Sequence, residues 1–174
     1  MLCLCHNAKE VNMNKQEIYE FLKKEGVWYE IDEHEAVYNM SELSEVRLSY
    51  PEYDAKNLFV RDDKRRSYYL ITVKGDKRVD LKEFRRSQGT KPLTFANADD
   101  LMSILGLIPG AVTPLGLLND TEHRVKFFLD REFLDGQAII GVHPNDNTAT
   151  VWLKTADLLT ILEKNQTEVA TVEL

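Results

Sequence analysis

The sequence predicts an α/β (α+β) fold in which a mixed, largely antiparallel sheet is surrounded by helices in one compact domain. Three observations favour this class. Short strand-like runs outnumber the helical patterns, and several of these runs are separated only by tight turns. The 174 residues suffice for a sizeable core. No repeat, linker or low-complexity tract divides the chain, so we expect a flexible extension over residues 1–13 and a single domain over residues 14–170.

The first predicted element is a helix that begins after Asn14. The Asn14 side chain can cap this helix, Glu17 can complete a capping box, and Met13 can pack onto Ile18. Gly26 is expected to end the helix. A strand with its turn, a short helix and a loop containing Pro and Tyr are then expected over residues 28–37, 41–48 and 49–55.

A β-hairpin is predicted in the middle of the chain. The runs 58–61 and 68–73 have the composition of strands, and the charged segment 62–67 lies between them. A further turn at residues 74–76 and a brief helix at residues 79–86 are expected to follow.

The second half is predicted to begin with a helix capped by Asn97. Its apolar residues Leu101, Ile104 and Leu105 follow the helical spacing, and Gly106 stops it. The remaining predicted elements are two buried strands around a turn at Asp135 and Gly136, a further strand, and a closing helix led by Thr155, over residues 125–129, 137–142, 149–153 and 156–164.

The run from Gly106 to Asp120, GLIPGAVTPLGLLND, is too rich in Gly and Pro for a helix and too apolar for an ordinary exposed loop. We expect an irregular backbone held against the core. Backbone N–H groups that no regular ladder consumes can bind an anion or stabilise an oxyanion. The alternative is a rigid connection between a helix and a sheet.

The charge of the chain is unevenly distributed. The net charge is −7, yet residues 56–91 contain 12 Lys and Arg against 5 Asp and Glu. A local basic face can attract phosphate even on an acidic protein, so Lys64, Arg65 and Arg66 are candidates for nucleic-acid contact. The alternative is a solvated hairpin that carries lysines.

Several kinds of catalytic centre find no support in the sequence. Cys3 and Cys5 beside His6 offer only three ligands on a chain end, and the four histidines lack metal-ligand spacing, so we expect neither a metal nor a disulfide. The sequence has no Gly-x-Ser-x-Gly elbow and no phosphate-binding Gly-rich loop. We therefore expect no cofactor. No apolar stretch could span a membrane, and a cytoplasmic location is expected.

Four motifs occur in a fixed order: KNLFVRDD at 56–63, VDLK at 79–82, GAVTPLGLLND at 110–120, and GVHPN at 141–145 followed by NTATVWL. In this order the sequence resembles the YbaK/ProX-like prolyl-tRNA editing family of freestanding aminoacyl-tRNA deacylases, over roughly residues 14–165. It is most similar to members that remove alanine from proline tRNA. Ala111 stands where many relatives carry Ser, and Leu115 where many carry Phe.

The resemblance implies a compact α/β domain with a curved sheet and an activity that hydrolyses the ester of a misacylated tRNA. Lys56 corresponds to the family's functional lysine, and its ammonium group suits a phosphate, a ribose or the charge that develops at the ester. Asn57 could bind substrate or simply turn the chain into a strand. His143 could orient water or contact the terminal adenosine, although a histidine on an apolar strand is often a satisfied core residue.

The segment from Gly110 to Pro114 corresponds to the family's Gly-x-x-x-Pro loop. The resemblance implies that Gly110 permits close approach of the acyl group and that Ala111, Val112, Thr113 and Pro114 contribute to substrate binding. It also implies that a ribose hydroxyl of the tRNA helps to activate the water. Neither a metal nor a covalent protein nucleophile is then required.

The expected function is trans-editing of misacylated proline tRNA, with Ala-tRNA(Pro) as the first candidate substrate. The expected partners are tRNA and, as a further candidate, prolyl-tRNA synthetase, but no membrane. Two alternatives stay open. The same fold could act on Cys-, Ser- or Thr-charged tRNA, or it could bind tRNA or a synthetase without catalysis.

Overall fold

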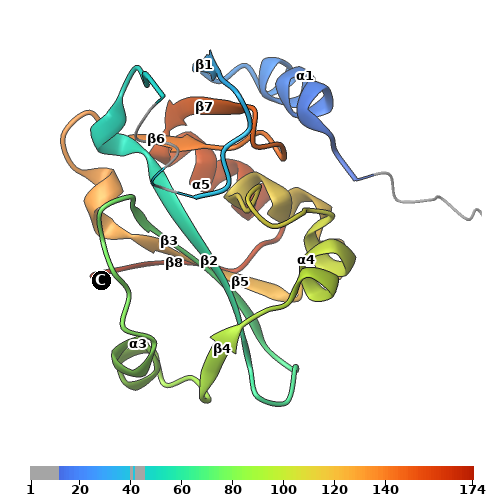
Figure 1. Cartoon of the computed structure of the whole chain (residues 1–174), viewed down its shortest axis with the longest axis vertical. Helices are drawn as coiled ribbons and strands as arrows, with labels where there is room; N and C mark the ends of the chain where they lie inside the picture. The colour runs from blue at the N-terminus through green and yellow to red at the C-terminus, as the bar shows by residue number, and fades with distance from the viewer. Residues whose placement is uncertain (1–11, 40, 42–45) are drawn as a thin grey trace, which may run out of the picture.

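The computed structural model describes residues 12–39, 41 and 46–174, which form two sheets with helices packed around them (Figure 1). The smaller sheet is antiparallel, with the strand order β1-β7-β6. Its strands are β1 (Tyr29–Glu33), β6 (Ile139–Val142) and β7 (Ala149–Lys154). It therefore joins a strand from the beginning of the chain to two strands from near its end.

The larger sheet has the strand order β4-β2-β3-β5-β8. It consists of β2 (Ala55–Asp62), β3 (Tyr68–Lys74), β4 (Leu93–Phe95), β5 (Val125–Asp130) and β8 (Val169–Val172). The β2–β3 hairpin and the β2–β4 pair are antiparallel, whereas β5 is parallel to both β3 and β8. The predicted mixed, largely antiparallel architecture is confirmed, but it is divided between two sheets.

Some predicted elements differ from those observed. The predicted turn at Asp135 and Gly136 is present, since the Ala138 N–H donates to the Asp135 carbonyl at 3.0 Å. The strands before and after it belong to different sheets, however, and the 3₁₀ helix η3 (Arg131–Leu134) precedes the turn. The strands β4 and β8 were not predicted. The helix expected over 41–48 falls largely on residues outside the described part of the chain, and its described end at 46–48 is not helical.

The helices follow their predicted caps in most cases. In α1 (Lys15–Glu25), the Asn14 side chain accepts from the Glu17 N–H at 2.9 Å, and Gly26 ends the helix with a φ of 68°. Asn97 caps α4 (Ala98–Leu105) in the same way. The closing helix is led by Thr155, as predicted, although this residue does not cap it.

The closing helix α5 (Thr155–Lys164) begins without a side-chain cap. Thr155 is instead fully buried, and its hydroxyl donates to the Phe133 carbonyl at 2.7 Å. A short connection, the 3₁₀ helix η1 (Pro51–Tyr53), leads into β2.

The main core lies between the two sheets and is closed by α1, α4 and α5. The opposite face of the larger sheet is covered by α3 (Leu81–Gln88), whose Phe84 ring meets that of Phe128 edge-on at a centroid distance of 4.9 Å. Both faces of β2 are therefore covered. The cover is complete at Phe59 and Val60, while the start of β2, residues 55–58, is half-buried and is held by its pairing with β3. This start carries several candidate site residues.

The run from Gly106 to Asp120 lies against the core, as predicted, with Leu107, Leu115 and Leu117 fully or almost fully buried. The expectation that no helix occurs in it is wrong for its second half, which forms the 3₁₀ helix η2 (Pro114–Asn119). Two side-chain amides tie the segment in place: Asn119 donates to the Leu105 carbonyl at 2.8 Å, and Asn165 donates to the Leu117 carbonyl at 3.1 Å.

Candidate functional site

A pocket of about 200 Å³ opens where the beginning of β2 faces β6 and the loop that precedes η2. Its lining includes five of the predicted site residues, which come from three distant segments: Lys56, Asn57, Gly110, Val112 and His143. The fold thus brings together side chains that lie almost ninety positions apart in the sequence. Lys64, Arg65 and Arg66 are not part of this pocket.

Lys56 and Asn57 lie inside β2, not before it as predicted. The strand begins at Ala55, and Lys56 and Asn57 pair across the sheet with Val73 and Thr72. The reason is that β3 continues as far as Lys74 and supplies pairing partners to the earlier residues. Consecutive residues of a strand point to opposite faces, and the two side chains accordingly bond different partners, the Lys77 carbonyl and the Val112 carbonyl, although both residues line the pocket.

The Asn57 side chain joins the sheet to the Gly110–Pro114 loop. Its amide group donates to the Val112 carbonyl at 3.1 Å, and its amide oxygen accepts from the Thr72 hydroxyl at 2.6 Å. Both ends of the amide are therefore engaged with the protein. This geometry gives Asn57 a positioning role, since it fixes the backbone of the loop against β2.

The loop residues divide into two groups. Gly110 and Val112 line the pocket, whereas Ala111, Thr113 and Pro114 are buried in the protein. Gly110 has a φ of 90°, and a Cβ atom there would lie 3.1 Å from the Tyr38 ring, so a larger residue would be strained and crowded. The Thr113 hydroxyl donates to the His143 carbonyl at 2.7 Å and so ties the loop to the end of β6.

His143 is held in one tautomer. Its Nδ1 lies 2.9 Å from the Ala149 carbonyl, and because a carbonyl can only accept, Nδ1 carries the proton and Nε2 keeps its lone pair. Burial lowers the pKa of His143 below the ordinary histidine range, although the bond to Ala149 opposes this shift. A neutral imidazole with an accepting Nε2 can orient or deprotonate a water molecule.

The Lys56 ammonium donates to the carbonyl of Lys77, which follows β3. Lys77 itself is held by Asp130 and Glu132, at 2.6 and 2.7 Å, and by the Leu174 carbonyl at 2.7 Å. The long, flexible Lys56 side chain can exchange this single carbonyl partner for a substrate group.

A histidine and threonine pair at the pocket was not foreseen in the sequence. The His34 Nδ1 lies 2.8 Å from the Glu35 carbonyl, so its Nε2 accepts from the Thr150 hydroxyl at 3.1 Å. Thr150 lines the pocket, and the His34 ring lies 6.3 Å from that of His143. The two residues are 116 positions apart, and no local signal relates them.

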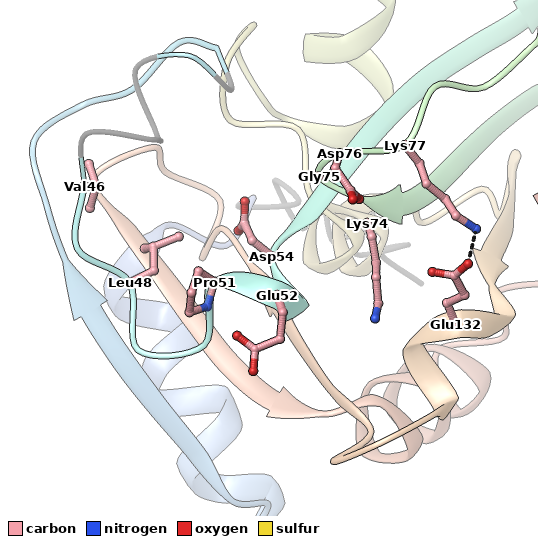
Figure 2. Close-up of a pocket in the computed structure, with 10 residues that line it drawn as sticks. All are labelled: Val46, Leu48, Pro51, Glu52, Asp54, Lys74, Gly75, Asp76, Lys77 and Glu132. Carbon is pink, nitrogen blue, oxygen red and sulfur yellow. Dashed lines mark ion pairs between the residues drawn. The ribbon is translucent and has the colours of Figure 1, made fainter.

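Asp54 is the other residue that sequence reasoning missed. It lines the small pocket and also a larger cavity of about 610 Å³ on its other side, which is shown in Figure 2. Its side chain is only 7% exposed, and its Oδ2 has no hydrogen-bond partner among the described residues. Burial raises the pKa of Asp54 to about 7, against a smaller opposing effect of the Ala55 N–H.

Charged side chains line much of the larger cavity, and Val46, Leu48 and Pro51 form an apolar part of its lining. Figure 2 shows Lys77 paired with Glu132 at one edge, while Glu52 and the Lys74 ammonium point the opposite way from the Asp54 carboxylate. The Lys74 ammonium lies 5.1 Å from the centre of the Tyr53 ring, a cation–π contact. Asp54 therefore lies in the wall between two cavities, with its carboxylate turned from these two charged groups.

The predicted tRNA contacts Lys64, Arg65 and Arg66 lie at the tip of the β2–β3 hairpin and are exposed. Figure 1 shows this tip at the far end of β2 from the small sheet. At about 3.3 Å per strand residue, the tip is about 25 Å from Lys56. Arg66 lines a separate cavity together with Arg124 and Lys126.

The described residues include no group of three or more His, Cys, Asp or Glu side chains that could hold a metal ion. Cys3, Cys5 and His6 lie outside the described part of the chain. Among the described helices, none has the length and apolar character needed to cross a membrane.

The chain matches a known protein family over most of its length. The sequence profile of the aminoacyl-tRNA editing domain matches residues 34–161. The chain belongs to this family. The match contains the whole set of pocket residues, from Val37 to Thr150.

Two curated relatives align with most of the length of this chain. The chain is 37% identical over 160 residues to the prolyl-tRNA editing protein ProX of Acetoanaerobium sticklandii, and the alignment covers 92% of this chain and 97% of that protein. It is also 37% identical over 153 residues to the prolyl-tRNA synthetase associated domain-containing protein 1 of Danio rerio, covering 87% and 83% of the two chains.

Solved structures agree with the fold of the editing domain. A crystal structure of a candidate trans-editing enzyme for prolyl tRNA synthetase superimposes with a TM-score of 0.65 and 19% identity, covering 94% of this chain and 99% of the other. At this identity the likeness concerns the fold. It confirms the expected α/β domain of the prolyl-tRNA editing type.

We predict that replacing Asp54 stabilises the protein in a pH-dependent way. The folded pKa of about 7 lies above the ordinary value of 3.8, so the folded state holds the proton more tightly and ionisation of Asp54 destabilises it. This cost is absent below pH 3.8, grows up to about pH 7 and is complete above it. Asp54→Asn should therefore raise the melting temperature more at pH 8 than at pH 5.

The gain has an upper bound of about 4 kcal/mol, at about 1.36 kcal/mol per pKa unit. Thermal melting across pH 4–9 measures it. The control is Asp76→Asn, which removes an exposed carboxylate at the edge of the same larger cavity and should leave the pH profile of stability unchanged. A parallel shift of the Asp54→Asn curve at every pH would contradict the prediction.

Proposed function

We propose that this chain is a trans-editing aminoacyl-tRNA deacylase that hydrolyses the ester of misacylated proline tRNA, with Ala-tRNA(Pro) as its preferred substrate. The observation that carries the proposal is the convergence of Lys56, Asn57, Gly110, Val112 and His143 on one pocket in a member of the aminoacyl-tRNA editing family. The names of the relatives, which specify prolyl-tRNA editing and association with prolyl-tRNA synthetase, support proline tRNA as the carrier.

The proposed chemistry is attack of water on an ester that is already reactive. His143 offers the accepting Nε2 described above, which can orient that water. Lys56 supplies positive charge for the developing oxyanion or for the acceptor-end phosphate. A ribose hydroxyl of the terminal adenosine would assist, as the family resemblance implies. The scheme uses neither a metal nor a covalent protein nucleophile.

The backbone of the loop can supply further donors. The Ala111 N–H already donates to the Ile108 carbonyl at 3.1 Å, which leaves the N–H groups of Gly110 and Val112 as the candidates. Both residues line the pocket. Asn57 binds the Val112 carbonyl and the Ala111 N–H binds the Ile108 carbonyl, so the peptide planes on both sides of the Val112 N–H are held before substrate enters.

The size and lining of the pocket support a small acyl group. Its volume is about 200 Å³, and Val112 presents an apolar side chain to it. A proline-activating enzyme cannot fully reject alanine, because a missing methylene contributes only about 1–3 kcal/mol to discrimination. A second site must instead admit the smaller group and exclude the larger. Cysteinyl, seryl and threonyl esters remain the alternative substrates of the same fold.

We predict that Lys56→Ala abolishes most of the deacylation of Ala-tRNA(Pro) while the protein still folds. The lysine side chain makes a single contact with a carbonyl in the described structure, so its loss should have a small effect on stability. Loss of an oxyanion-stabilising group costs about 10²–10³-fold in rate. Single-turnover hydrolysis together with thermal melting measures both properties.

The matched comparison is Thr150→Val, which removes the hydroxyl bonded to His34 and leaves Lys56 in place. In the proposed scheme this variant retains most of the rate. A stable Lys56→Ala protein with the parental rate would contradict the proposed role of Lys56. A folded Thr150→Val protein without activity would point instead to a threonine nucleophile with His34 as its base.

We predict that Ala-tRNA(Pro) is hydrolysed much faster than Pro-tRNA(Pro), with the seryl and cysteinyl forms intermediate or slow. The rigid Gly110–Pro114 loop is proposed to act as the steric wall that excludes the proline ring. Single-turnover rates for the four esters decide the question. Equal rates for the alanyl and prolyl esters would refute the editing proposal, and a preference for the cysteinyl ester would assign the chain to the alternative substrate class.

We predict that neutralising Lys64, Arg65 and Arg66 together weakens tRNA binding and reduces its salt dependence. Each lost phosphate contact should lower the slope of log K against log salt by about 0.7 to 0.9. The control is neutralisation of Lys23 and Lys24, two exposed lysines near the end of α1, away from the hairpin tip (Figure 1). An unchanged slope for the hairpin variant would mean that the tip faces away from the tRNA.

A further inference from the structure

One oxygen of the Asp54 carboxylate is an acceptor without a donor among the described residues. Asp54 is 93% buried, and its Oδ2 has no hydrogen-bond partner among the described residues. The residue also lines the small pocket. A buried carboxylate without a partner is costly, and its burial is not needed to fill the core. This arrangement is typical of a group whose partner is a ligand.

The neighbouring cations are already engaged elsewhere. Lys56 donates to a carbonyl, Lys77 is paired with Asp130, and Lys74 lies over the Tyr53 ring. Among the described residues, no lysine or arginine lies within ion-pair distance of Asp54. The charge of Asp54 is therefore available to a cation that enters the pocket.

The rest of the lining limits what that cation can be. A metal ion would need further acidic or imidazole ligands, and no such cluster exists among the described residues. A compact ammonium group needs only a carboxylate and one or two further acceptors. In a pocket of about 200 Å³, the acyl part of an aminoacyl ester brings such a group with it.

We propose that the Asp54 carboxylate binds the α-ammonium group of the aminoacyl ester. The proposal rests on the proposed function and adds a specificity determinant to it. Every aminoacyl-tRNA carries this ammonium whatever its side chain, so Asp54 recognises the class of ester, while the Gly110–Pro114 loop selects the side chain. Asp54 lies immediately before β2, in an isolated bridge with Gly141, and Lys56 follows two residues later, so the two charges of the substrate-binding wall have a fixed separation along the backbone.

One consequence is selection against N-blocked esters. Acylation of the α-nitrogen, as in a peptidyl-tRNA, removes the positive charge and adds bulk at the buried carboxylate. Such an ester would leave Asp54 unpaired and would gain nothing from the charge. The deacylase would then ignore tRNAs that carry a nascent or blocked amino acid.

The first arm of the test measures binding without hydrolysis. The probes are 3′-alanylamino-3′-deoxyadenosine, which holds alanine through a stable amide, and its N-acetyl derivative. The wild-type protein should bind the free amine about 10- to 100-fold more tightly, which is typical of a hydrogen bond between charged groups. Asp54→Asn should bind both probes equally, while the control Glu52→Gln, exposed on the larger cavity, should keep the preference.

The second arm measures hydrolysis of Ala-tRNA(Pro) and N-acetyl-Ala-tRNA(Pro). If the wild type binds the free amine preferentially but hydrolyses neither ester, the proposed function fails and the assignment of Asp54 stands. If Asp54→Asn slows both esters equally, Asp54 acts on the reaction and not on the ammonium, and the assignment fails. Equal binding of the two probes by the wild type also overturns it, and this comparison needs no variant that might misfold.

Discussion

The pocket depends on a line of hydrogen bonds that crosses from one sheet to the other. The Asn57 amide connects the Thr72 hydroxyl of the larger sheet to the Val112 carbonyl, and the next loop residue, Thr113, connects to the His143 carbonyl at the end of β6. Each partner is buried or half-buried, so a missing link would leave an unpaired polar group. The loop has no ladder of its own, and these side chains are what hold its irregular backbone in one conformation.

This construction separates two tasks that a catalytic loop must perform. The buried residues Ala111, Thr113 and Pro114 anchor the segment, and Gly110 and Val112 remain at the surface of the pocket. The family resemblance had suggested substrate contacts for all five. Alternation between anchoring and lining residues explains why a loop with few polar side chains can still be rigid. Ala111, where the family resemblance suggested Ser, faces the interior and not the pocket.

Features that depend on neighbouring residues, such as helix caps, could be predicted from the sequence, whereas pairings between distant segments could not. Asn14, Gly26 and Asn97 act within one helical turn, so their caps could be read from neighbouring residues. The strand β8 owes its pairing to β5, about forty residues earlier, and nothing in its own four residues required that partner. Lys56, His143 and the loop could be named only through the family motifs. Asp54 could not be named at all, because an aspartate before a strand is ordinary until the fold buries it.

Charged residues of two kinds lie near the two ends of β2. At its beginning, a buried carboxylate lies two residues before a lysine; beyond its end, about 25 Å away, an exposed cluster of three basic residues forms the hairpin tip. A buried charge needs a partner in direct contact and at a well-defined geometry. An exposed basic cluster instead acts through an electrostatic field that salt screens over about 10 Å. The first kind suits recognition of a single ammonium group and the second suits a phosphate backbone. In the proposed scheme, β2 connects a pocket that recognises a single ammonium group to an exposed basic tip that binds a phosphate backbone, and the pairing of β2 with β3 keeps the distance between them constant.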